Sequence, residues 1–201
     1  MQKPILLLLG LCMLTVCLAY PNTGFGQCGD TLVTGVKNFD YKKFVGNTWD
    51  IAFAPNNVFY QSVKSANLQF SLAVDGYICK LSILLKDGTT QISKFHETYL
   101  GNSSALETQL NDCDKPSQDT NTITIYGFKD KAYVQYFICS TNGVKSALDA
   151  RFVIVPRGKI LTSKERVEIN KNDKKQKFFG DTVKLFIGQC KKNVKTTNDD
   201  E

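Results

Sequence analysis

The sequence predicts an all-β domain, an eight-stranded antiparallel up-and-down barrel. Three observations support this fold class. From Trp49 onward, apolar residues recur at every second position, which is the period of a strand with one buried face. Glycine turns such as Asp75-Gly76 and Asp87-Gly88 divide the alternating stretches at short, even spacing. The pattern becomes helical only after Pro156.

The expected strands follow one another with short connections. They span residues 49–53, 68–74, 77–85, 90–100, 104–110, 122–128, 132–139 and 148–155. A short helical turn precedes them and ends at Gly46-Asn47, and its apolar residues are Phe39, Phe44 and Val45. After the strands, a helix capped by Thr162 or Ser163 runs to about Asn172, and a closing strand spans 182–187.

The same strand pattern also suits a two-layer sandwich. A meander joins each strand to its neighbour without a crossover, and closing the sheet removes its exposed edges, so the barrel is favoured. A barrel of eight strands is just wide enough to hold one small ligand.

The first residues indicate a secreted protein. Lys3 is followed by the apolar run Ile5–Leu9, and the small residues Cys17 and Ala19 come before Tyr20. This is the pattern of a signal peptide, and the apolar run is too short to span a bilayer. We therefore expect a signal peptide over residues 1–19, one domain over residues 20–201, secretion, and no stable membrane insertion.

The formal net charge is +6, and many of its lysines lie in the last quarter of the chain. Such a basic excess suits nucleic acid, but in a secreted protein it is better explained by a solvated helix face and tail. We expect no nucleic-acid partner.

Four segments of the chain resemble motifs of the lipocalin family. They are Asn38–Trp49, Ala132–Cys139, Arg151–Thr162 and Lys184–Cys190. They are similar to the entry motif, the cysteine-bearing strand, the last barrel strand with its arginine, and the closing strand. The similarity is greatest to insect secreted lipocalins of the bilin-binding and apolipoprotein D kind. It implies that Trp49 closes the narrow end of the barrel and that the Arg157 guanidinium stacks on its indole.

Five cysteines remain after the expected cleavage, an odd number. They are Cys28, Cys79, Cys113, Cys139 and Cys190. Their wide spacing contains no C-x-x-C, so no metal site is expected. In an oxidising compartment most should be paired. The resemblance implies a Cys28–Cys139 disulfide and a second from Cys190 to either Cys79 or Cys113.

The resemblance also implies extracellular binding and transport of a small hydrophobic or amphipathic ligand in the barrel, or calyx. A fatty acid, sterol, retinoid, pheromone or tetrapyrrole would suit it. If Cys139 points outward, alternation turns its strand's other face inward, and a closed end at Arg157 turns Arg151, Val153 and Val155 inward. The expected lining is Phe53, Phe70, Ile123, Ile125, Val134, Tyr136, Ile138, Arg151 and Val153.

Other functions have less support in the sequence. His96, the only histidine, could bind haem iron in a gas carrier, although its inward register is ambiguous. Scavenging of small amines and a cell-surface receptor as partner stay open. Catalytic motifs are lacking, so we expect no enzyme; bilin or haem would be a ligand rather than a resident cofactor. Asn102-Ser103-Ser104 is an N-glycosylation sequon, so we expect a glycan at Asn102.

Overall fold

The computed structural model describes residues 26–29, 33–37, 39–100, 105–110, 120–140, 150–178 and 180–187, with backbone only for 26, 27, 99, 105–110 and 120. The expected signal peptide, Asn102, Cys113 and Cys190 lie outside these residues. No helix in the described part is long and apolar enough to cross a membrane.

Most of the described chain is strand. The elements are β1 (Gly26–Gln27), the 3-10 turn η1 (Tyr41–Phe44), β2 (Thr48–Pro55), α1 (Val58–Ser62), β3 (Val63–Leu72), β4 (Gly76–Leu85), β5 (Thr90–Tyr99), β6 (Ala105–Leu110), β7 (Thr120–Lys129), β8 (Tyr133–Ser140), β9 (Arg151–Pro156), α2 (Ser163–Lys175) and β10 (Thr182–Lys184).

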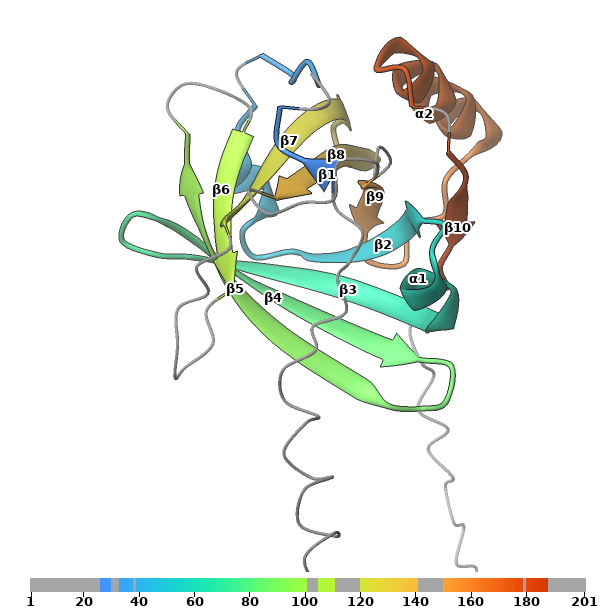
Figure 1. Ribbon diagram of the computed structural model, residues 1–201, viewed down its shortest axis with the longest axis horizontal. Helices are drawn as coiled ribbons and strands as arrows, with labels where there is room; N and C mark the ends of the chain where they lie inside the picture. Colours follow the sequence, from blue (N-terminus) through green and yellow to red (C-terminus); the bar gives the residue numbers. More distant parts are fainter. Residues whose placement is uncertain are drawn as a thin grey trace, which may run out of the picture.

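Strands β2 to β9 form the expected antiparallel up-and-down barrel (Figure 1). Each strand pairs with the next, and β9 pairs with both β8 and β2, so the order closes on itself. Two short strands lie outside this ring: β1 runs parallel to β8, and β10 pairs with β2. The fold class predicted from alternation and turn spacing is confirmed.

Two local features were not predicted. The strand β3 begins at Val63, five residues before the predicted start at residue 68. A bulge between Val63 and Ser65 interrupts the alternation there, so the sequence pattern does not mark the first residues of the strand. The short helix α1 fills the connection before it, and the Asn57 side chain caps this helix by accepting from the backbone N–H of Tyr60 at 2.9 Å.

Aromatic side chains close one end of the barrel below β2. Asp40 caps η1, and the turn carries Phe44 between the Trp49 indole and the Phe70 ring. The Phe44 ring stacks on Phe70 with centroids 4.7 Å apart and meets Trp49 edge-on at 5.4 Å. The indole N–H also donates to the Phe44 carbonyl oxygen at 3.4 Å. Phe44, Trp49 and Phe70 thus form an aromatic plug at this end, with a ring on each side of Phe44.

The predicted stack of Arg157 on Trp49 is not found. Trp49 pairs with Pro156, so Arg157 lies one residue past the end of β9, where its side chain is exposed. In the described part of the chain, the cation–π contacts are Lys43 over Phe128 and Arg151 over Phe178. Only the backbone of Arg157 contributes here, since its N–H donates to the Thr48 carbonyl at 2.9 Å.

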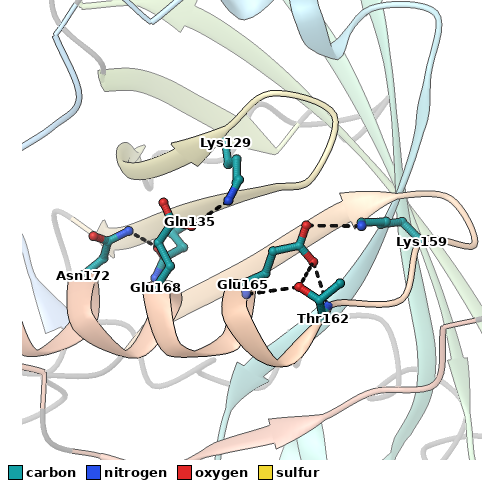
Figure 2. A network of polar contacts seen from close by, with 7 residues as sticks. All are labelled: Lys129, Gln135, Lys159, Thr162, Glu165, Glu168 and Asn172. Atoms are coloured by element: carbon teal, nitrogen blue, oxygen red, sulfur yellow. Dashed lines mark hydrogen bonds and ion pairs between the residues drawn. The ribbon is translucent and has the colours of Figure 1, made fainter.

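Helix α2 lies outside the ring of strands and is fixed by polar contacts (Figure 2). Thr162 and Glu165 form a capping box at its start. Lys129 pairs with Glu168 at 2.9 Å, and the Asn172 amide donates to Gln135 at 2.7 Å. The helix thereby covers the outer face of β7 and β8 and leaves the barrel interior to other residues.

One of the two expected disulfides is present. Cys28 and Cys139 are bonded, which ties the segment after β1 to the outside of β8. Cys79 is a buried free thiol, so the alternative that pairs it with Cys190 is wrong. Its side chain points into the barrel, where no other cysteine of the described chain can reach it. A bridge between Cys190 and Cys113 stays a prediction.

Candidate ligand-binding site

The interior of the barrel is lined by apolar residues of most strands. On β7 and β8 the predicted inward set lies in this main core cluster: Ile123, Ile125, Val134, Tyr136 and Ile138. Cys139 points to the opposite face, as its bond to Cys28 requires. On these strands alternation gives the inward face correctly, because the disulfide fixes Cys139 on the outer face. The role of these residues toward a ligand stays a prediction.

The inward set predicted on β9 is wrong. Val134 pairs with Ile154 and Tyr136 with Phe152, and cross-strand partners share a face, so Phe152 and Ile154 point inward. Val153 and Val155 face α2 on the outside instead. The prediction failed because it assumed that Arg157 stacks on Trp49 at the closed end, whereas the Arg157 side chain is exposed.

Arg151 is likewise outside the barrel, not in a ligand site. Its side chain is 6% exposed, and its Nε donates to Asp173 Oδ2 at 3.0 Å while a terminal nitrogen donates to the Gly180 carbonyl. Its guanidinium also lies over the Phe178 ring at 5.3 Å. The expectation that a buried arginine needs a carboxylate is met, but the carboxylate is Asp173 of α2.

Of the two residues predicted to point inward on β2 and β3, only the one on β3 does so. A bulge in the β2–β9 pairing between Ile51 and Phe53 shifts the alternation, so Ile51 and Ala54 join the interior cluster. Phe53 packs with the outer cluster, and its predicted inward position is wrong. Phe70 does point inward, at the closed base against Phe44.

The interior contains a buried carboxyl group that the sequence did not reveal. Glu97 of β5 is 3% exposed, and the Cys79 thiol of β4 donates a hydrogen bond to it. Within the described part of the chain, the buried Glu97 Oε2 atom has no hydrogen-bond partner. Glu97 and Tyr77 are cross-strand partners, and Cys79 is opposite Phe95, so all four side chains share the inner face.

Burial controls the protonation of this polar cluster. Desolvation raises the pKa of Glu97 to about 8, and the hydrogen bond from Cys79 opposes the shift only partly. Burial and the nearby Glu97 raise the pKa of the Cys79 thiol well above its usual range. The pKa of Tyr136 is also raised, by burial first and then by Tyr60, Cys79 and Glu97. At neutral pH the cluster on its own is therefore almost entirely uncharged.

Aromatic rings stand beside these polar groups. Tyr136 stacks on Phe152 with centroids 5.0 Å apart, and Tyr60 of α1 meets the same ring edge-on at 5.3 Å. Tyr60 is buried although α1 is a short surface helix, so α1 supplies one wall of the site. A few polar groups that converge within an apolar and aromatic interior are typical of a small-molecule site.

His96 is excluded as an interior ligand of haem iron. It follows Phe95 and precedes Glu97, both inward, so its ring lies on the outer face. There its Nε2 lies 2.8 Å from Asp75 Oδ1. Among the residues that the structure describes, no group of three histidine, cysteine, aspartate or glutamate side chains could hold a metal ion.

The arrangement of the chain matches known structures although its sequence does not match known families. No family model matches the sequence, and no curated protein matches it. Insecticyanin from the tobacco hornworm Manduca sexta superimposes with a TM-score of 0.61 at 9% identity, over 82% of this chain and 88% of that one. Lobster apocrustacyanin A1 gives 0.56 at 12% identity, over 81% and 94%.

A third similar structure is the tryptamine complex of the amine-binding protein of Rhodnius prolixus. It gives a TM-score of 0.55 at 12% identity and covers 75% of this chain and 81% of that one. At these sequence identities the matches do not indicate a shared ligand, but they show an extensive shared arrangement of strands. The chain has the lipocalin fold.

Proposed function

We propose that this protein is an extracellular carrier that holds one small amphipathic molecule inside the barrel, with the polar group of that molecule against Glu97. The observation that carries the proposal is the buried Glu97 carboxyl with an unpartnered oxygen in an apolar interior. An uncompensated buried carboxyl is unfavourable for folding, and an apolar side chain would fill the same space without that penalty. A partner brought by a ligand would compensate for it.

Among the ligand classes considered, a small apolar amine fits this carboxyl best. A protonated amine can donate to Glu97 Oε2 and form an ion pair with it in a site of low dielectric. The carboxylate of a fatty acid would instead face another carboxyl group. The aromatic rings of Tyr60, Tyr136 and Phe152 would pack on the apolar part of the amine. The amine-binding protein of Rhodnius prolixus, solved with tryptamine, shows only that a barrel of this arrangement can hold such a molecule.

The amine proposal has a specific dependence on pH. Since the pKa of Glu97 is about 8, an amine that pairs with the ionised form must displace a proton from it. The ionised fraction of Glu97 is about 1% at pH 6, 9% at pH 7 and 50% at pH 8 by the titration equation. The affinity for an amine should therefore rise about tenfold from pH 6 to 7 and about fivefold from pH 7 to 8.

Isothermal titration calorimetry tests this directly. Tryptamine is titrated at the three pH values beside tryptophol, in which a hydroxyl replaces the amine. Tryptamine should show the rise in affinity and release close to one proton at pH 7, while the affinity for tryptophol stays constant. Glu97→Gln should abolish the rise, and Glu168→Gln, which removes an exposed carboxylate of α2, should retain it.

Failure of the amine proposal and failure of the carrier proposal are distinguishable. Binding of a fluorescent fatty acid, a retinoid, a sterol or biliverdin without binding of tryptamine would keep the carrier and reject the amine. Absence of saturable binding across the whole panel would reject the carrier. Secretion is supported by the Cys28–Cys139 disulfide, and an N-terminus at or near Tyr20 in the secreted protein would establish the cleavage.

A further inference from the structure

A second concave site adjoins the interior site, with which it shares the Tyr60 side chain. This groove has a volume of about 570 Å³, and its lining comes from α1, the start of β3, the β4–β5 turn and the chain around β10. Its lining residues are Tyr60, Gln61, Val63, Lys64, Lys86, Val183, Lys184, Leu185 and Phe186. Its volume lies within the usual range for small-molecule sites, about 300–1,000 Å³.

The groove exists because β2 and β3 separate. They pair only where Thr48–Asp50 faces Asn67–Gln69, and further along, the segment from β10 onward fills the seam. The Leu185 N–H donates to Ala52 at 3.0 Å, and the Phe186 N–H donates to Lys64 at 2.9 Å, so this segment is bonded to both strands. Backbone bonds on both sides give the groove a fixed wall.

The neighbouring hairpin brings a further lysine to the same place. The backbone N–H of Lys86 donates to the Ser62 carbonyl at the end of α1 at 2.9 Å. This bond holds the β4–β5 turn against α1, and Lys86 thereby joins the lining together with Lys64 and Lys184.

The lining combines three cations with an apolar floor. No aspartate or glutamate is among the lining residues, and none of the three lysines forms an ion pair with another residue of the described chain. Tyr60, Val63 and Leu185 form a buried apolar base, whereas Phe186 at the edge is 56% exposed. Cations that surround an apolar surface are complementary to a molecule that has an anionic head and an apolar tail.

We propose that this groove binds an anionic amphiphile, meaning a carboxylate or phosphate monoester attached to an alkyl chain. The anionic group lies among Lys64, Lys86 and Lys184, and the alkyl chain lies along Tyr60, Leu185 and Phe186. The groove presents three cations whereas the interior site presents a carboxyl group, so the two sites select different ligands. This inference does not depend on the function proposed for the barrel interior.

Calorimetry with decyl phosphate and decanoate, below their micelle concentrations and at low salt, tests the proposal. The variant K64M/K86M/K184M removes the three charges but keeps apolar stems, and all three side chains are exposed, so folding should be preserved. The control K94M/K164M/K171M makes the same change of net charge at exposed lysines that do not line the groove. Unfolding midpoints of both variants verify that they fold.

The groove variant should bind both amphiphiles at least tenfold more weakly than wild type, and the control variant should bind them within twofold. Glu97→Gln should leave this difference unchanged, which separates the groove from the barrel interior. Equal binding by the two triple variants would overturn the proposal. Two further results would also overturn it: decanol binding as tightly as decanoate, or inorganic phosphate binding as tightly as decyl phosphate.

Discussion

The buried Glu97 makes the stability of the fold depend on pH in a direction opposite to that of most carboxylates. Its pKa is 4.5 in a model compound and about 8 in the folded protein. Between these values the unfolded chain loses the Glu97 proton while the folded chain keeps it. The unfolded state is therefore favoured progressively as pH rises from about 4.5 to about 8, and the loss is complete above the folded pKa.

Glu97→Gln removes this dependence because the amide is isosteric with the protonated acid and does not ionise. Each unit of pKa corresponds to about 1.4 kcal/mol, so the shift from 4.5 to about 8 corresponds to roughly 5 kcal/mol. The variant should match wild type near pH 4 and exceed it by an amount of that order above pH 8. For a domain of this size, that difference raises Tm by about 10–20 °C.

Urea unfolding of both proteins at several pH values from 4 to 9, with the disulfide intact, measures the difference. Glu168→Gln is the matched control. Lys129 lowers the pKa of Glu168, so the small stabilisation from this exposed pair, about 1 kcal/mol or less, is lost as pH falls. The two variants should thus differ from wild type with opposite pH trends. A Glu97→Gln difference that stays constant across this range would refute the assignment of Glu97 as a buried, protonated acid.

Four further variants test the packing and the disulfide. Arg151→Met should destabilise the fold by about 3–5 kcal/mol in urea unfolding, because it removes the buried cation that pairs with Asp173 and leaves the neutral donors Tyr126 and Gln135 beside that carboxylate, and a cost below 1 kcal/mol would contradict that pairing. Phe44→Ala should cost about 3–5 kcal/mol and Arg157→Ala less than about 0.5 kcal/mol, since only Phe44 packs on Trp49; equal thermal shifts would argue against this plug. Cys28→Ser/Cys139→Ser removes a link between residues 111 apart in sequence and should cost about 5 kcal/mol relative to the oxidised wild type by the chain-entropy model. The reduced wild type is the control and should be as unstable as the variant.

The sequence was sufficient for the strand order because alternation and turn residues are local signals. Register was harder, since a single bulge reverses the faces of every residue beyond it. The bulge between Ile51 and Phe53 turned Phe53 outward, and nothing in the residue types there marks it. On β8 the cysteine gave a covalent anchor, and the inward set was right.

Glu97 was missed for a different reason. Polar and apolar residues occur on both faces of β5, so composition cannot tell which face is buried, and the inward register of this strand stayed ambiguous. Only the pairing of Glu97 with Tyr77 and the contact with Cys79 place it inside. Short helices such as α1 are equally hard to predict, since five residues carry too little periodicity.

The double pairing of β9 constrains the order in which the protein can assemble. This six-residue strand is made late during synthesis, yet β2 near the start of the domain has no partner along most of one side until β9 arrives. The edges of β2 and β8 are therefore open to association with other chains during the whole interval between the two strands. A fragment that stops before β9 would keep both open edges permanently. The pairing of β9 with β2 and β8 is therefore the step that closes an association-prone sheet.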